Sequence, residues 1–252
     1  MNSDLMQAMQ ANLLSPSVLF FMLGVVATLS KSDLRFPEPL YLGLTIYLLT
    51  AIGFKGGVAI ARVGIEAVWL PAVAAIVLGS LIPLWSYPVL RFLGRLSPID
   101  AAAVAAHYGS VSAVTFIAAT NFLKSLDQPY EEFAPAFLAL MESPAIIVGV
   151  VLGKLSNQKP GESFVPTLKV ALHEACLGRS VILLVGAMLI GFLSGARGYE
   201  ETAGFFVAPF QGVLALFLLE MGMVAARRFG DLRKVGLFLV AFGVVMPVLH
   251  GT

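Results

Sequence analysis

Eight apolar segments, each separated from the next by polar or turn-forming residues, are the feature that most constrains this chain. Each is close to the length that a helix needs to cross the hydrocarbon core of a bilayer, roughly 17 to 25 residues. We place them at about residues 13–30, 39–61, 67–93, 99–123, 133–154, 179–196, 204–226 and 235–252. Because a helix satisfies its backbone hydrogen bonds internally, this pattern predicts an all-α, polytopic membrane protein.

The composition supports this class and excludes others. Of the 252 residues, 58% are hydrophobic and 12% are charged, which is about half the charged share of a soluble domain. The formal net charge is +1 and no basic patch is interleaved with aromatic residues, so we expect no nucleic-acid binding. The single Cys176 excludes an internal disulfide framework. The first twelve residues carry no lysine or arginine, so we expect the first segment to be a retained helix.

Basic residues orient the predicted helices. If the N-terminus is outside, 12 of the 16 lysines and arginines fall on the inner side, as the positive-inside rule requires. Between the fifth and sixth segments, apolar residues recur at helical spacing over residues 164–177. We therefore expect an interfacial amphipathic helix within a cytoplasmic linker at residues 156–178.

A weak internal repeat suggests how the segments are organised. Residues 47–54 align with residues 216–223 at an offset of 169, and an odd number of five segments per unit would make the two copies inverted. We expect a first five-span repeat at residues 1–155 and an incomplete second repeat at residues 179–252. On this prediction the chain holds about eight of ten spans and is truncated or is completed by another polypeptide.

Small and hydroxyl-bearing residues interrupt the fourth segment. A Gly/Ser break in a spanning helix is tolerated only where it is buried in protein or lines a wet cavity, and transporters place ligands at such breaks. Hydroxyls both donate and accept hydrogen bonds, and a restarted helix presents free amides that favour an anion. The predicted substrate-binding residues are Gly109, Ser110, Val111, Ser112 and Thr115. The alternative is that these small residues only allow close helix packing.

Ionisable and amide side chains at membrane depth supply the candidates for ion coupling. Glu142 lies inside the fifth segment and either couples sodium or makes a structural hydrogen bond. Asp100 is a candidate too, with a helix N-cap as the alternative. Asn121 lies near the outer end of the fourth segment, where it lines an access path or reaches the interface. We favour an interfacial position for Lys55, a core hydrogen bond for His107 and an interhelical tether for Glu220.

Several motifs resemble the SbtA-type sodium-dependent bicarbonate permease family of cyanobacteria and many other bacteria. The motifs are Ile99-Asp100-Ala101 leading into residues 109–115, Pro129-Tyr130-Glu131, residues 141–145, Gly222-Met223 and residues 247–251. The resemblance covers nearly the whole chain in order and spacing.

This resemblance implies ten spans in two inverted five-span repeats, with a core domain that moves against a gate domain. The implied activity is sodium-coupled bicarbonate uptake by alternating access in the bacterial inner membrane. Spans 3 to 5 would carry the substrate, and spans 1, 2, 6 and 7 would form the scaffold. Sodium is then the coupling ion, and no other cofactor is expected. A homotrimer and a PII-like regulatory protein at the cytoplasmic face are also implied.

The sequence departs from the cyanobacterial pattern at three positions. Ala113 and Val114 stand where those members tend to carry Gly and Ser, and Glu142 replaces an Asp. The identity of the anion is therefore open between bicarbonate and a similar small anion. Two other classes remain as alternatives: a non-transporting assembly or sensor subunit, and an intramembrane hydrolase that would use Ser110 or Ser112 with His107.

Overall fold

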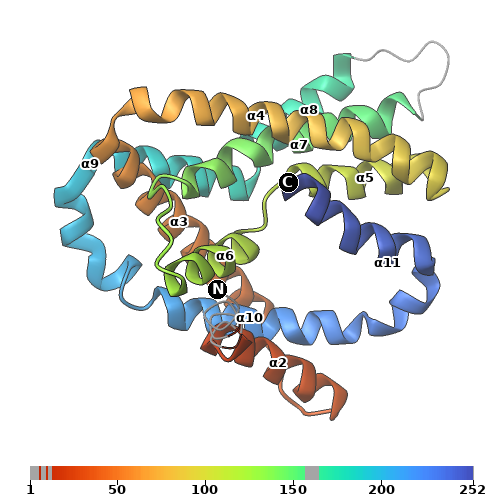
Figure 1. Ribbon diagram of the computed structural model, residues 1–252, viewed down its shortest axis with the longest axis horizontal. Coiled ribbons are helices and arrows are strands. Elements are labelled where there is room, and N and C mark those ends of the chain that lie inside the picture. Colours follow the sequence, from red (N-terminus) through yellow and green to blue (C-terminus); the bar gives the residue numbers. More distant parts are fainter. Residues whose placement is uncertain (1–5, 7–9, 11–12, 157–164, 252) are drawn as a thin grey trace.

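In the part of the chain that the computed structural model describes, residues 6, 10, 13–156 and 165–251, every regular element is helical. The predicted all-α class is therefore confirmed. The predicted first repeat and linker include residues 1–5, 7–9, 11–12 and 157–164, which lie outside the described residues. The elements are α2 Pro16–Leu29, α3 Glu38–Val63, α4 Ile65–Pro88, the π-helix η1 Val89–Leu93, α5 Pro98–Gly109, α6 Ala113–Ser125, α7 Pro135–Leu155, α8 Val165–Leu177, α9 Arg179–Phe206, α10 Phe210–Arg227 and α11 Phe229–Gly251 (Figure 1).

Five of the described helices are long and apolar enough to cross a membrane: α3, α4 with η1, α7, α9 and α10. They correspond to the second, third, fifth, sixth and seventh predicted segments. The first and last predicted segments are shorter apolar helices, and the fourth is divided between α5 and α6. The predicted amphipathic helix is α8, and only its expected first residue, Phe164, lies outside the described residues. The structure thus supports a multi-pass membrane protein.

Two glycines turn the chain inside helical runs near predicted segment boundaries. Gly195 has φ +57° within α9, next to the expected end of the sixth segment at residue 196. Gly236 has φ +77° within α11, next to the expected start of the eighth segment at residue 235. Such backbone angles are strained for residues with a Cβ, so these glycines permit the changes of helix direction.

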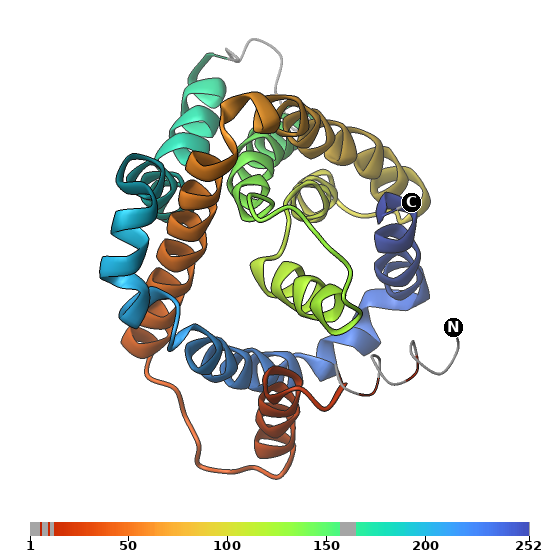
Figure 2. The same cartoon turned by 60° about the vertical axis from the view of Figure 1, so that its left-hand side comes forward.

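The described helices pack as two groups. The most extensive contacts join α3 to α9 and α2 to α10, and α10 also contacts α3; we call these four helices the α3 group. In the second, the α4 group, α4, α5 and α7 all contact one another. Contacts between the groups are fewer and join α3 to α7, α3 to α4 and α7 to α9. In Figure 2 the α5 and α6 ribbons lie inside a ring formed by α3, α4, α10 and α11.

Glycines bring the backbones of the α3 group into contact. A Cβ at Gly57 of α3 would overlap the Met188 carbonyl oxygen of α9, and one at Gly191 of α9 would overlap the Phe54 carbonyl oxygen. Gly24 of α2 and Gly222 of α10 face carbonyl oxygens of each other's helix in the same way. In lipid, where apolar burial offers little driving force, such close approach is a main source of helix association.

Gly57→Ala should therefore destabilise the protein, by about 1–3 kcal/mol, because the added methyl group forces α3 and α9 apart. Gly43→Ala is the matched control, since Gly43 lies in the same helix and a Cβ added there would meet nothing within 4 Å. The control should be neutral or stabilise the helix by up to about 1 kcal/mol. Thermal unfolding of the detergent-solubilised protein measures both. Equal unfolding midpoints for the two variants would contradict this account of the interface.

Candidate functional site

The chain leaves the helical conformation at residues 110–112, inside the fourth predicted segment, as the small-residue run predicts. The helix α5 ends at Gly109 and α6 begins at Ala113. Ser112 is the N-cap of α6, and its Oγ accepts a hydrogen bond of 3.4 Å from the Thr115 amide. The break therefore consists of one helix C-terminus and one helix N-terminus joined by three extended or turn residues.

Close packing against α4 fixes the end of α5. A Cβ at Gly109 would overlap the Pro83 ring and would lie 2.6 Å from the Gly79 carbonyl oxygen. The same stretch of α4 touches α7, because a Cβ at Gly79 would lie 3.0 Å from the Met141 carbonyl oxygen. Pro83 has no amide hydrogen, so the Gly79 carbonyl lacks its normal i+4 donor. An oxygen without that donor thus faces the start of the break.

At the break the chain passes from one helix group to the other. Before it, α5 packs in the α4 group. After it, Val111, Phe116 and Ile117 contact an apolar cluster built mainly from α3, α9 and α10, which includes Ile52 and Leu214. Within the described part of the chain, α6 has no extensive helix-to-helix contact of its own. The link between the two groups is therefore short and packs through its side chains.

The predicted hydroxyls have different surroundings. Ser110 is half-buried, its amide donates to the Ala106 carbonyl at 3.2 Å, and its hydroxyl has no partner among the described residues. Ser112 is exposed and caps α6, and Thr115 is exposed one turn further on. The Ser110 and Thr115 hydroxyls, which have no hydrogen-bond partner among the described residues, are therefore the ones available to a ligand.

The three ion-coupling candidates lie in three separate places. Glu142 of α7 is half-buried, and its Oε1 accepts a 2.7 Å hydrogen bond from Ser180 Oγ at the start of α9. It follows Met141, whose carbonyl packs on Gly79 close to the break. Asp100 lies in the first turn of α5, about 14 Å from Gly109 along the helix, and accepts a 2.6 Å hydrogen bond from Ser97 Oγ. The third candidate, Asn121, lines a cavity beyond the break.

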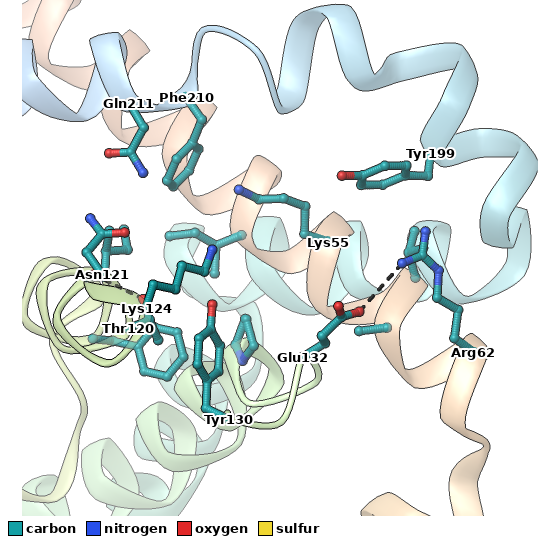
Figure 3. A pocket seen from close by; sticks show the side chains of 16 residues that line it. Lys55, Arg62, Thr120, Asn121, Lys124, Tyr130, Glu132, Tyr199, Phe210 and Gln211 are labelled. Carbon is teal, nitrogen blue, oxygen red and sulfur yellow. Dashed lines mark hydrogen bonds and ion pairs between the residues drawn. The ribbon is translucent and has the colours of Figure 1, made fainter. Parts of the chain in front are cut away.

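That cavity, of about 260 Å³, lies between α3, α6, α9 and α10 (Figure 3). Its charged residues are Lys55, Arg62, Lys124 and Glu132, and its other polar residues are Thr120, Asn121, Tyr130, Tyr199 and Gln211. The sequence predicted Asn121 on an access path or at the interface and Lys55 at the interface, but it did not indicate that they share a cavity. The predicted topology could have indicated this cavity, because it puts the C-terminal ends of the second, fourth and sixth segments on the outer side of the membrane.

Two predictions about single ionisable residues need correction. His107 does not lie in the core: it is exposed, and its Nδ1 is 2.9 Å from the Ala103 carbonyl one turn earlier in α5. Glu220 is buried as expected, but its ion-pair partner is on its own helix, where Arg227 Nη1 lies 3.9 Å from Oε1. A partner two turns along α10 makes it an intrahelical pair, where an interhelical tether was expected.

Comparison with known proteins agrees with the helical architecture. No curated protein matches the chain significantly. A family model described as the Na+-dependent bicarbonate transporter superfamily matches residues 16–252, which is almost the whole chain and includes the break, the cavity and both helix groups. The chain therefore belongs to the Na+-dependent bicarbonate transporter superfamily.

Proposed function

We propose that this protein takes up bicarbonate or a similar small anion together with sodium, by alternating access. The observation that carries the proposal is the break at residues 110–112, where the predicted fourth spanning segment opens between the two helix groups. Membership of a transporter family supports transport over the hydrolase alternative. The substrate-binding residues we propose are Gly109, Ser110, Val111, Ser112 and Thr115.

The chemistry of the break suits an anion. The first amides of α6 have no intrahelical acceptor, and the positive end of the helix dipole lies there. Ser112 satisfies the Thr115 amide, so the amides before it and the free Ser110 hydroxyl are the available donors. We propose that these donors hold a planar oxyanion at the three-residue gap.

We propose that sodium binds to oxygen atoms of α4 and α7 near the same junction. Hard cations prefer carboxylate and carbonyl oxygens. The Gly79 carbonyl lacks its i+4 donor and faces Gly109, and Glu142 is adjacent to the Met141 carbonyl that packs on Gly79. We therefore propose Glu142 as the main ion-coupling residue. Asp100 and Asn121 lie too far along α5 and α6 to join it directly, so any role of theirs is at the two ends of the pathway.

The helix pairing supports the proposed inverted repeat. In the proposed repeat, segment 1 corresponds to segment 6 and segment 2 to segment 7. The packing of segment 1 on segment 7 (α2 on α10) is therefore equivalent to the packing of segment 6 on segment 2 (α9 on α3), and both pairs are in contact. Gly53 and Gly222, which are 169 residues apart, occupy matching positions: each faces a carbonyl oxygen of the partner helix, that of Leu184 and that of Phe21. The α3 group then corresponds to the proposed scaffold and the α4 group to the proposed substrate-carrying unit.

The positions of basic residues at the helix ends support the proposed topology. Arg62 and Lys124, both expected outside, line one cavity. Arg35 and Arg227, both expected inside, line another cavity of about 320 Å³ at the ends of α2 and α10. We accordingly propose an N-terminus outside the bacterial inner membrane. The family resemblance suggests in addition a homotrimer, with a PII-like partner at the face that carries Arg35 and Arg227.

In proteoliposomes, labelled bicarbonate uptake should depend on an inward sodium gradient. The variant Ser110→Ala with Ser112→Ala should lower the initial rate about tenfold or more, because hydrogen bonds to a charged ligand are worth about 1.5–3 kcal/mol each. Ser80→Ala with Thr50→Ala is the matched control, since those hydroxyls only donate to Ile76 and Ile46 of their own helices. Sodium-independent uptake, or equal loss in both variants, would contradict the proposal. Absence of uptake in the wild-type protein would favour an assembly or sensor subunit.

Two variants separate the coupling role of Glu142 from its structural one. Glu142→Gln keeps an oxygen that can accept from Ser180 but removes the charge, whereas Ser180→Ala removes the hydrogen bond and keeps the charge. If Glu142 couples sodium, Glu142→Gln should raise the sodium concentration for half-maximal uptake about tenfold. Ser180→Ala should change it much less. The reverse order of effects, measured in the same uptake assay, would show that the carboxylate serves mainly to join α7 to α9.

A further inference from the structure

The cavity between α3 and α6 is a separate place from the break. Residues 109–112 are not part of its lining, and α6 leads from one to the other. From Ser112 to Lys124 the rise along this helix is about 18 Å. A ligand in the cavity therefore does not occupy the proposed substrate site.

The cavity carries uncompensated positive charge. It holds three cationic side chains and one carboxylate, and that carboxylate, Glu132, pairs with Arg62 at 3.5 Å. Neither Lys55 nor Lys124 forms an ion pair within the described part of the chain. The two ammonium groups are close enough to repel one another. Two unpaired like charges in a partly buried space are unfavourable unless an anion joins them.

Aromatic rings hold these ammonium groups without neutralising them. Lys55 Nζ lies 3.6 Å from the centre of the Phe210 ring, and Lys124 Nζ lies 5.8 Å from the centre of the Tyr130 ring. A ring face attracts a cation but contributes no net charge, so both ammonium groups keep their capacity for an anion. Figure 3 shows the two side chains entering the same space from α3 and α6, with Asn121, Tyr130 and Gln211 around it.

We propose that this cavity is a second anion site, which binds a small, singly charged oxyanion between Lys55 and Lys124. The Asn121 and Gln211 amides and the Tyr130 hydroxyl supply further donors. At about 260 Å³ the space is smaller than typical pockets for drug-sized ligands, which favours a small anion over a nucleotide or a lipid headgroup. That the anion is bicarbonate rests on the proposed function. The site would then collect substrate at the outer end of α6, before the anion reaches the break.

Binding without sodium isolates this site, because the break is expected to need the coupling ion. The probe is labelled bicarbonate, equilibrated by dialysis with the purified full chain in a sodium-free buffer of low ionic strength. Lys55→Gln with Lys124→Gln should weaken binding at least tenfold, while Ser110→Ala with Ser112→Ala should leave it unchanged. The matched control is Lys154→Gln, an exposed lysine in the last turn of α7, which should have no effect.

Unchanged binding in the double lysine variant, or an equal loss in the Lys154→Gln control, would overturn the proposal. If the double variant does not fold, Lys124→Gln alone carries the test, since this side chain is exposed in the last turn of α6. It should weaken binding several-fold, and Lys124→Arg should retain binding. Lysine-dependent binding without any uptake by the wild-type protein would contradict the proposed function and leave this site standing. Sodium-driven uptake without lysine-dependent binding would support the proposed function and contradict this second site.

Discussion

In hydrocarbon, every backbone amide and carbonyl must find a partner inside the protein, and the rest of this structure depends on that constraint. It explains why the described residues are helical throughout their regular elements. It also explains why the interrupted fourth segment, α5 and α6, lies inside a ring of other helices in Figure 2. Ser112 caps α6 and the α5 end packs on α4 through Gly109, whereas the Gly79 carbonyl and the Ser110 hydroxyl keep their capacity for a ligand.

The same constraint links packing to function. Glycines let α3 meet α9 and α2 meet α10 at backbone distance, which makes the α3 group a firmly joined unit. The α4 group is held to it by fewer contacts, and α6 crosses between them with little backbone contact of its own. A ligand at the break therefore touches the segment that crosses between the two groups. Binding there can alter how the two groups sit, as the proposed alternating access requires.

The sequence predicted those features that follow from hydropathy and local chemistry. The helical class, the opening after Gly109 and the helix α8 all depend on residues close in sequence. What it could not predict depends on contacts between distant helices. The cavity that joins Lys55 to Lys124, the Gly79 carbonyl at the break, and the Ser180 hydroxyl on Glu142 each combine residues from different helices. The partners of His107 and Glu220 were predicted wrongly. Each of these two residues interacts with a group on the same helix, where an intrahelical contact competes with a tertiary one.

Distance measurements between the two helix groups test the central claim most directly. Spin labels at the exposed positions Val77 of α4 and Leu189 of α9, in a Cys176→Ser background, report on movement between the groups. A control pair at Ile46 of α3 and Leu189 lies within one group. In nanodiscs, sodium and bicarbonate together should shift the distance distribution between α4 and α9 and leave the control pair unchanged. The same α4 to α9 distribution with no ligand, with either ligand and with both would contradict the account.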